Sequence, residues 1–599
     1  METKTIVLND IDYVSRDNKP IVRLFGVDSE TNENIIAFDT TFKPYLYVLP
    51  RNMDECLVEL RELDLDDLEI EIKIDIGIER EFIKITLNHP QDVPKYRDDI
   101  RDLPSVKQIR EYDIPFYRRY LIDKQITPTN IIKLQGKTLD ANIYREELKV
   151  DDNVILFKLL EDPYDTHEVI NENKLLSFDI EVYNAEGMPD AEKDPIIMMS
   201  LCGSNGFKKV LSTKKSNRDF VETLPTEEDM IKRFGEIIKE ENPDMLVGYN
   251  SDNFDLPYIK KRADKLKINL NLGIDGSGIK FMKRGFANAG VIRGRIHVDL
   301  YLLVRRNMSL DRYTLERVYE ELFDQEKIDV PGNQIYKYWD SNDEKLEELF
   351  DYSMDDAVTT TAIGDKLTPL AIAQARLVGQ PLFDIARMTT GQMVEWYLIL
   401  KAYEKNNIIP NKPSGNEYSQ RRNKGVMGGY VKDPEKGLFE HIAYLDFKSL
   451  YPSIIIAQNI SPDTIIEDVS GFNESEYYVS PEDGFKFRKE PKGFIPSIIG
   501  YILDERQRIK KLMKEETVPE QKRAYDFEQQ GLKRLANSMF GAYGYSRFRW
   551  YKIECAAAIT AWGREYIKSA MKKSEEYGFK PIYADTDGFY ATYLGDLDE

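Results

Sequence analysis

The chain has 599 residues, of which 42% are hydrophobic and 31% charged, so several globular domains are expected and a single compact core is excluded. Its three cysteines, Cys56, Cys202 and Cys555, lie far apart, and only four histidines occur, which argues against a disulfide framework and a Cys/His zinc cluster. No apolar run is long enough to span a membrane, and the N-terminus does not resemble a signal peptide. A reducing cytoplasm therefore fits best.

The formal net charge of -22 argues, taken alone, against a nucleic-acid partner, because phosphate binding requires a basic surface. A protein that is acidic overall can still be basic along one groove. The segment from Arg506 to Arg549 is such a region, since its lysines and arginines outnumber its acids. A solvated helical hairpin explains the same charge run equally well at this point.

The predicted elements change in character along the chain. Residues 5–50 are expected to form short strands separated by turns, such as the one at 16–20. A strand over 174–182, a helix over 227–240 and a strand over 245–247 indicate an α/β domain. The later predictions are helices within 344–406, a strand at 442–445, helices over 498–513 and 525–539, and a strand, turn and strand over 581–592.

A first group of acids begins on the strand at 174–182. Asp179 and Glu181 lie two residues apart, so both carboxylates point to the same face, where a divalent cation relieves their repulsion. Asp-x-Glu alone is weak evidence in so acidic a chain. Asp255, and Tyr352 with Asp356 one helical turn later, supply two more acids and a hydroxyl. Four acidic ligands for two metals about 4 Å apart, with a tyrosine to orient the attacking water, are what a nuclease requires.

A second group of acids lies near the C-terminal end. Asp446 follows the strand at 442–445, and Asp585 and Asp587 flank a turn residue. The three carboxylates meet if the two strands are neighbours in one sheet; an ordinary turn is the alternative for Asp-x-Asp.

Between these acids lie two helices with paired polar residues. Arg506 and Lys510 are one turn apart on the first helix, and Lys533 and Asn537 on the second. If the helices pack antiparallel, these donors converge and suit a triphosphate. Metal-binding acids with a cationic cradle are the equipment of phosphoryl transfer.

The order of these segments resembles the order of the motifs in family B DNA polymerases, and their residues are most similar to those of the archaeal branch. The segments similar to the three exonuclease motifs are 178–181, 249–255 and 352–356; those similar to polymerase motifs A, B and C are 446–454, 533–541 and 583–588; and 426–430 resembles the Gly-Gly linker between exonuclease and palm. Two departures are Val426 and Phe540, where tyrosine is common, so template contact or the polymerase–exonuclease balance is expected to differ.

The resemblance implies a role for each motif residue. The implied activity is DNA-directed DNA synthesis from dNTPs with 3′-5′ proofreading, using two Mg²⁺ per active site, or Mn²⁺ instead. The implied metal ligands are Asp446, Asp587 and, in support, Asp585 for synthesis, and Asp179, Glu181, Asp255 and Asp356, beside the catalytic Tyr352, for proofreading. The implied nucleotide contacts are Leu450, Tyr451, Arg506, Lys510, Lys533, Asn537 and Phe540, and the DNA contacts are Asn250, Gly428, Gly429 and Tyr430.

The N-terminal region also resembles the archaeal members. The residues similar to a template-uracil pocket are Tyr13, Pro44, Tyr45, Val93, Pro94, Ile114 and Phe116. A core patch of aromatic and apolar residues is an equally good interpretation.

The implied fold is multidomain α/β and α+β. It has an N-terminal β-rich domain, an RNase H-like (DnaQ-like) exonuclease domain, a palm with an antiparallel sheet and helical-hairpin fingers, and it lacks a thumb. The predicted boundaries are 1–168 for the N-terminal domain, 169–368 for the exonuclease, 369–410 for a helical return segment, 411–491 for the first palm part, 492–545 for the fingers and 546–599 for the second palm part.

Family members continue well past motif C into a thumb that grips the duplex. We therefore expect primer–template DNA and dNTPs as partners, with a separate small C-terminal subunit that carries the thumb and through which a sliding clamp is recruited. Two alternatives stay open from the sequence. The chain acts alone mainly as a 3′-5′ exonuclease, or it is a structural subunit of a replication complex; the complete set of acids argues against the latter.

Overall fold

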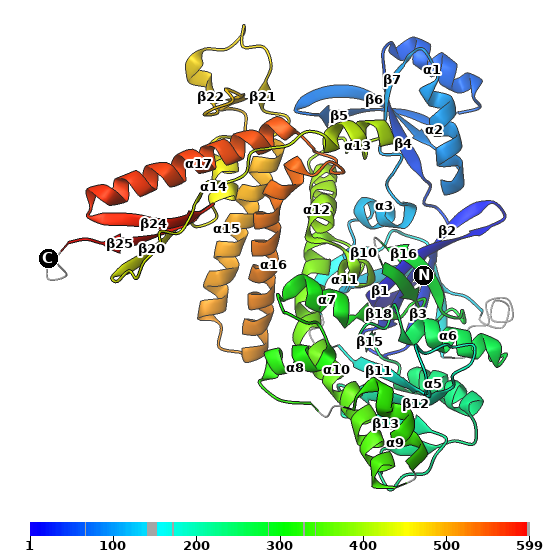
Figure 1. Ribbon diagram of the computed structural model, residues 1–599. Coiled ribbons are helices and arrows are strands. Elements are labelled where there is room, and N and C mark those ends of the chain that lie inside the picture. The colour runs from blue at the N-terminus through cyan, green and yellow to red at the C-terminus, as the bar shows by residue number, and fades with distance from the viewer. Residues whose placement is uncertain are drawn as a thin grey trace. The chain divides into compact units, whose positions relative to one another are not determined.

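The computed structural model describes residues 1–65, 67–140, 153–169, 173–284, 287–327, 330–341 and 343–595. The chain divides into two compact units (Figure 1): unit 1 comprises Met1–Phe42 and Pro115–Thr389, and unit 2 comprises Lys43–Ile114 and Thr390–Glu599. None of the helices in the described ranges is both long and apolar enough to cross a membrane.

Unit 1 begins with a six-stranded sheet in the order β1-β2-β3-β9-β8-β10, which closes on itself because β1 also pairs with β8. Its strands are β1 (Glu2–Arg16), β2 (Lys19–Asp28), β3 (Asn34–Asp39), β8 (Asn130–Thr138), β9 (Val154–Leu159) and β10 (Tyr164–Val169). The prediction of short strands in residues 5–50 is wrong for the first strand, since β1 has 15 residues. Asp17 and Asn18 make the turn after it with φ of 49° and 57°, as a two-residue hairpin loop requires.

The second sheet of unit 1 has the order β14-β13-β12-β11-β15-β18 and carries the first group of acids. Its strands are β11 (Leu175–Val182), β12 (Ile196–Gly203), β13 (Lys208–Ser212), β14 (Val221–Thr223), β15 (Met245–Gly248) and β18 (Ile296–Asp299). Helices α5 (Glu227–Glu241) and α6 (Asp255–Lys265) contribute Ile231, Phe234 and Ile259 to its core. The predicted strands and helix of this α/β region are confirmed.

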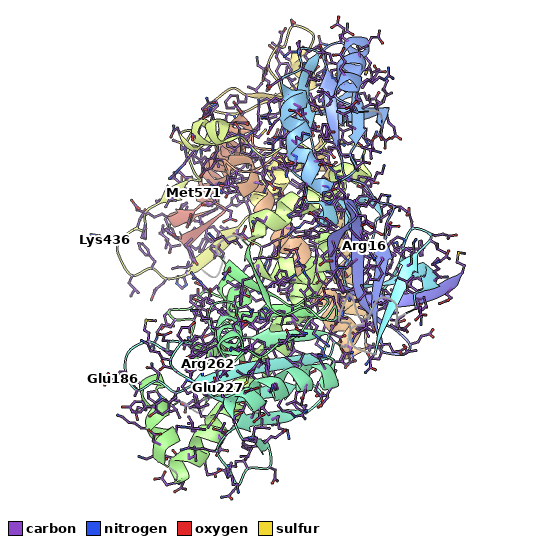
Figure 2. The ribbon with its side chains drawn as sticks, turned by 90° about the vertical axis from the view of Figure 1, so that its right-hand side faces the viewer. Arg16, Glu186, Glu227, Arg262, Lys436 and Met571 are labelled. Carbon is purple, nitrogen blue, oxygen red and sulfur yellow. The ribbon has the colours of Figure 1, made fainter. Side chains whose placement is uncertain are left out.

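An ion pair between α5 and α6 fixes these two helices beside the sheet. Arg262 Nε donates to Glu227 Oε1 at 2.7 Å, and the Ile196 N–H donates to the same oxygen at 2.9 Å; both charged residues are labelled in Figure 2. Because Glu227 is the first residue of α5, Ile196 opens β12 and Arg262 lies in the last turn of α6, the pair joins the two helices to one strand.

Helix α10 (Glu344–Val378) packs on β11 and β12 and carries the later part of the first acidic group. The predicted boundary at residue 368 falls inside this single helix, because Pro369 is accommodated within α10 and does not end it. Gly379, with φ of 67°, terminates the helix. The other elements of unit 1 are α3 (Phe116–Asp123), β16 (Lys280–Arg284), β17 (Ala287–Val291), α7 (Leu300–Asn307), α8 (Leu315–Phe323), η2 (Gly332–Gln334), α9 (Ile335–Ser341) and α11 (Leu382–Arg387).

Unit 2 contains the second group of acids on a four-stranded sheet with the order β19-β24-β25-β20. Its strands are β19 (Val431–Lys432), β20 (Ile442–Asp446), β24 (Phe579–Asp585) and β25 (Gly588–Tyr593), and all pair antiparallel. Helix α17 (Ile553–Glu576) packs against β24, with Ile567 in a core shared with Ala584 and Phe589.

Two long helices, α15 (Phe494–Glu515) and α16 (Pro519–Gly544), run side by side in opposite directions within the range expected for the fingers (Figure 1). The remaining elements of unit 2 are β4 (Tyr45–Pro50), α1 (Met53–Glu62), β5 (Leu68–Asp75), β6 (Ile78–Thr86), η1 (Pro90–Asp92), α2 (Val93–Arg101), β7 (Val106–Arg110), α12 (Thr390–Glu404), α13 (Gly415–Arg422), α14 (Leu450–Ala457), β21 (Ile465–Ile466), η3 (Glu474–Glu476), β22 (Tyr477–Val479) and β23 (Lys486–Arg488). The finer domain boundaries and the absence of a thumb stay predictions.

Candidate active sites

The first acidic site lies where β11 faces α10 in unit 1. Asp179, Glu181 and Asp356 offer carboxylate oxygens within 4.8 Å of one another. Asp179 and Glu181 alternate with buried apolar residues of β11, and α10 brings Asp356 to the same face. Asp255, the first residue of α6, is close enough to raise the pKa of Asp179 by repulsion. The structure thus brings together all four acids predicted from the sequence.

The electrostatics of this site are those of crowded, buried carboxylates. Burial, with repulsion from Asp255 and Asp356, raises the pKa of Asp179 well above its usual value. Burial likewise raises the pKa of Asp255 to about 7 and that of Asp356 to about 6. Burial and the nearby charges of Glu181, Asp356 and Asp179 raise the pKa of Tyr352, which lies one turn from Asp356 on α10. The carboxylates of this site therefore repel one another when ionised, and a bound cation would relieve that repulsion.

A lysine that the sequence reasoning missed lies among these acids. The fully buried side chain of Lys327 forms an ion pair with Asp356, and its Nζ lies 3.9 Å from Asp355 Oδ2. The same Nζ is 4.4 Å from the ring centre of Tyr352. A single lysine in a loop has no periodicity, so its positive charge in the acidic stretch 324–329 is the only signal that sequence offers.

The donor set fits a hard divalent cation. Carboxylate oxygens are the ligands that such cations prefer, and the 4.8 Å spacing is one that a single ion can bridge. Asp255 Oδ1 is buried, and no residue in the described part of the chain donates a hydrogen bond to it, which leaves it available as a ligand.

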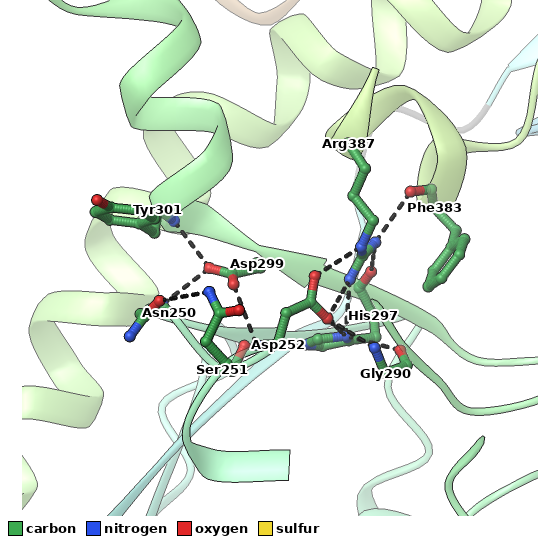
Figure 3. Close-up of polar contacts among 10 residues, drawn as sticks. Asn250, Ser251, Asp252, Gly290, His297, Asp299, Tyr301, Phe383 and Arg387 are labelled. Atoms are coloured by element: carbon green, nitrogen blue, oxygen red, sulfur yellow. Dashed lines mark hydrogen bonds and ion pairs between the residues drawn. The ribbon is translucent and has the colours of Figure 1, made fainter. Parts of the chain in front are cut away.

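A buried network holds the loop between β15 and α6 that leads into Asp255 (Figure 3). Arg387, the last residue of α11, donates from Nε to Asp252 Oδ2 at 2.8 Å and from Nη2 to Asp252 Oδ1 at 2.9 Å. The Gly290 N–H donates to Asp252 Oδ1 at 2.8 Å. His297 lies beside this pair, with Nε2 2.9 Å from Ser251 Oγ, and burial lowers its pKa to about 4. The loop is therefore fixed by a paired charge without solvent access.

Asp299 fixes the backbone of the same loop. Its Oδ1 accepts from the Asn250 N–H at 2.8 Å and from the Tyr301 N–H at 3.0 Å, and its Oδ2 accepts from the Asp252 N–H at 3.1 Å. Asn250 has a φ of 62°, the left-handed region that asparagine tolerates. Asn250 thus presents its side chain from a rigid loop. The sequence showed Asp252 inside a motif, but Asp299, His297 and Arg387 carried no signal there.

The second acidic site lies at the end of the β24–β25 hairpin in unit 2. Asp446 and Asp585 both lie opposite Gly588 in the strand register, so the two predicted neighbouring strands are confirmed. Thr586 forms the turn with φ of 57°, and the Phe447 N–H donates to the Asp587 carbonyl at 2.8 Å. Burial, with repulsion from Asp446 and Asp585, raises the pKa of Asp587. All three acids are solvent-exposed, unlike the buried acids of unit 1.

Tyr451, one of the residues predicted to bind nucleotide, lies near this hairpin, since burial raises its pKa and the charges of Asp587 and Asp585 raise it further. Tyr451 is on α14, and its ring centre lies 4.3 Å from that of Phe540 on α16. Leu450, the residue before Tyr451, is buried. A Cβ on Gly429 would lie 2.9 Å from Thr586 Oγ1 and 3.1 Å from Tyr451 Oη, so any larger residue there would displace the Thr586 or Tyr451 side chain.

The cationic residues predicted to bind the triphosphate lie on α15 and α16, two helices that pack against each other. Arg506 is partly buried and donates from Nε to Gln529 Oε1 at 3.3 Å, which joins α15 to α16. Lys510, Lys533 and Asn537 are exposed. Their convergence on one triphosphate stays a prediction.

The residues predicted for a uracil pocket divide between the two units. In unit 1, the rings of Tyr13 and Phe116 meet edge to face at 5.1 Å. In unit 2, Tyr45 meets Tyr47 edge to face at 5.6 Å, and Val93 packs against the core beneath β4. Pro44, Pro94 and Ile114 also belong to unit 2.

Comparison with known proteins decides the family. Residues 107–318 match "DNA polymerase family B, exonuclease domain", and residues 385–595 match "DNA polymerase family B". A DNA polymerase of Pyrococcus glycovorans is 44% identical over 98% of this chain and 71% of its own length. The chain belongs to DNA polymerase family B. The polymerase of Thermococcus gorgonarius is 42% identical over the same shares, and the solved family B polymerase of the archaeon Pyrobaculum calidifontis superimposes with a TM-score of 0.85 at 30% identity over 99% of this chain and 75% of that one.

The predicted activity is thereby confirmed: the chain is a family B DNA polymerase with an exonuclease domain, and its relatives are archaeal. The acids predicted for the exonuclease lie in unit 1, and those predicted for the polymerase lie in unit 2. The expectation of a separate thumb-bearing subunit gains no support, because these relatives match nearly the whole chain and each continues beyond the match within one longer chain.

Proposed function

We propose that this polymerase extends primers from dNTPs in cytoplasmic DNA replication, with Mg²⁺ as the metal of both acidic sites and Mn²⁺ as a substitute. The acids of each site support this, since carboxylate sets select hard divalent cations. The bound cation supplies charge neutralisation at the attacking and leaving oxygens. The free state of the three cysteines agrees with a reducing compartment.

In synthesis, Asp446 and Asp587 are the principal ligands and Asp585 supports them. The observation that separates Asp585 from Asp587 is that one Asp585 oxygen already accepts a side-chain hydrogen bond. Asp585 Oδ1 accepts the Thr586 hydroxyl at 2.8 Å, whereas Asp587 lies between two acids that raise its pKa. Tyr451 lies beneath the incoming sugar, and the exposed donors of α15 and α16 hold the triphosphate.

In proofreading, Asp179, Glu181, Asp255 and Asp356 hold the metals, and Tyr352 orients the attacking water. The position of Tyr352 supports this role, because its hydroxyl is close enough to Glu181, Asp356 and Asp179 for their charges to raise its pKa. Asn250 contacts the single-stranded 3′ end from its rigid loop.

Single-nucleotide incorporation by two isosteric variants tests the synthesis roles. We expect Asp587→Asn to lower the rate by at least ~1,000-fold and Asp585→Asn by only ~10- to 100-fold, because the former loses a principal ligand. Degradation of single-stranded ends by both variants serves as the internal control and stays at the wild-type rate. Equal losses for the two variants, or no loss, would contradict the proposed order.

Recognition of template uracil and recruitment of a sliding clamp stay predictions from the resemblance. Primer extension that stalls ahead of a template uracil supports the former, and unimpeded read-through ends it.

A further inference from the structure

Helix α17 presents a buried arginine to a segment without regular secondary structure. Arg564 is 5% exposed, and its Nη1 donates to the Met427 carbonyl at 3.0 Å and the Gly428 carbonyl at 2.6 Å. Its Nε donates to Glu482 Oε1 at 3.2 Å, and its Nη2 bonds Glu482 Oε2. The planar guanidinium thus spans two backbone carbonyls on one side and a carboxylate on the other, a geometry that an ammonium group cannot reproduce.

The carbonyls that Arg564 binds are the first part of the Gly-Gly linker, and the next part of that linker holds the catalytic hairpin. The Thr586 N–H donates to the Tyr430 carbonyl at 2.9 Å, and Val431 pairs with Asp585 in the sheet. Gly429 lies between these two attachments, against the Thr586 side chain. A displacement of the linker therefore reaches the turn that carries Asp585 and Asp587.

The same face of α17 contacts two more parts of the site. A Cβ on Gly563 would lie 2.9 Å from Tyr451 Cε1, so the helix approaches the Tyr451 ring as closely as a glycine allows. One turn beyond Arg564, Lys568 Nζ lies 5.2 Å from the ring centre of Tyr430. The helix thus contacts both the linker and the predicted nucleotide-binding tyrosine, through Gly563, Arg564 and Lys568.

We propose that Arg564 is a positioning residue for DNA synthesis: it holds the Met427 and Gly428 carbonyls so that the linker keeps the Asp585–Asp587 turn in place. An arginine that served only to stabilise α17 would have no reason to bind the linker, because Met427 is 68% exposed and space is open around Gly428. The proposal rests on the proposed roles of Asp585 and Asp587 in synthesis.

Amide hydrogen exchange tests the positioning directly and does not depend on polymerase activity. We expect Arg564→Met to speed exchange at least ~10-fold in peptides covering 424–432 and 583–589, while peptides of α15 and β6 keep their wild-type rates. Arg564→Lys, which keeps the charge but loses the planar fork, gives a smaller acceleration in the same peptides and carries the test if the methionine variant unfolds. The matched control is Lys580→Met, which removes an exposed palm ion pair with Glu435 at 2.6 Å and leaves exchange in both peptides unchanged.

Kinetics give the second readout. We expect Arg564→Met to lower kcat for dNTP incorporation about 10-fold and to leave degradation of single-stranded ends unchanged. Unchanged exchange in both peptides, or equal acceleration throughout the chain, overturns the proposal. An Asp446→Ala variant run alongside separates the two hypotheses: if it still incorporates dNTPs, the proposed synthesis site fails, whereas the exchange result judges Arg564 alone.

Discussion

Replacing Lys327 by methionine should make the stability of unit 1 depend on divalent metal. In the wild type, the buried ammonium group pairs with Asp356 and lies 3.9 Å from Asp355 Oδ2. Its positive charge also opposes the rise in pKa of Asp179 and Glu181. Without it, the acids keep their mutual repulsion and lose the positive charge that opposes it.

The magnitude follows from the burial of the pair. Two charges about 4 Å apart at an effective dielectric constant of about 20 interact by about 4 kcal/mol. Breaking a buried pair by removing one partner costs about 3–5 kcal/mol. For a unit of this size, that loss corresponds to a fall in Tm of about 5–10 °C. A bound cation restores the missing positive charge, so the fall should shrink to less than about 3 °C at saturating Mg²⁺.

Differential scanning calorimetry in EDTA and in Mg²⁺ provides the assay. The matched control is Lys345→Met, because Lys345 Nζ also lies over a tyrosine ring, that of Tyr338 at 5.9 Å, but is exposed and distant from the acids. We expect that control to unfold like the wild type in both conditions. A Lys327→Met deficit of the same size with and without Mg²⁺, or no deficit, would refute the reasoning.

Three further predictions follow from other contacts. Arg387→Met leaves the buried Asp252 carboxylate unpaired, so exonuclease kcat should fall at least ~10-fold while dNTP incorporation is kept; equal loss of both activities would point to general unfolding. Gly429→Ala should lower dNTP incorporation about 10-fold, and Gly428→Ala less than about threefold, because a Cβ has open space only at the latter; equal effects would contradict the linker geometry. His297, with its pKa near 4 in the folded state, stays neutral while the unfolded chain takes up a proton below pH 6.5, so its own contribution to stability should fall by about 2 kcal/mol between pH 8 and pH 5, opposite in sign to the contributions of Asp255 and Asp356, whose pKa values are raised. In denaturant titrations, the stability of the wild type should therefore fall relative to that of His297→Asn over this pH range, and a difference between the two proteins that does not change with pH would contradict the assignment.

The acids of both sites could be singled out from the sequence because each pair lies within a short segment at a spacing that a strand, helix or turn brings together. Asp179 and Glu181 share a strand face at a spacing of two, and Tyr352 and Asp356 share a helix face at a spacing of four. Asp585 and Asp587 flank a turn whose strands show alternating apolar residues. Because such periodicities depend on the local backbone alone, the strands and helices that carry these acids could be predicted from them, and the role of the acids as metal ligands stays a prediction.

Residues that act across the fold could not be predicted in this way. Lys327, Arg387 and Arg564 each meet their partners through tertiary contacts that no spacing in the sequence encodes.

The central claim is that two acidic sites perform two separable reactions on DNA. The most direct test measures extension and degradation of one labelled primer by Asp446→Ala and Asp179→Ala variants under the same conditions. The account predicts that Asp446→Ala abolishes dNTP incorporation and still degrades single-stranded ends, while Asp179→Ala incorporates dNTPs and no longer degrades them. Survival of both activities in both variants would contradict it.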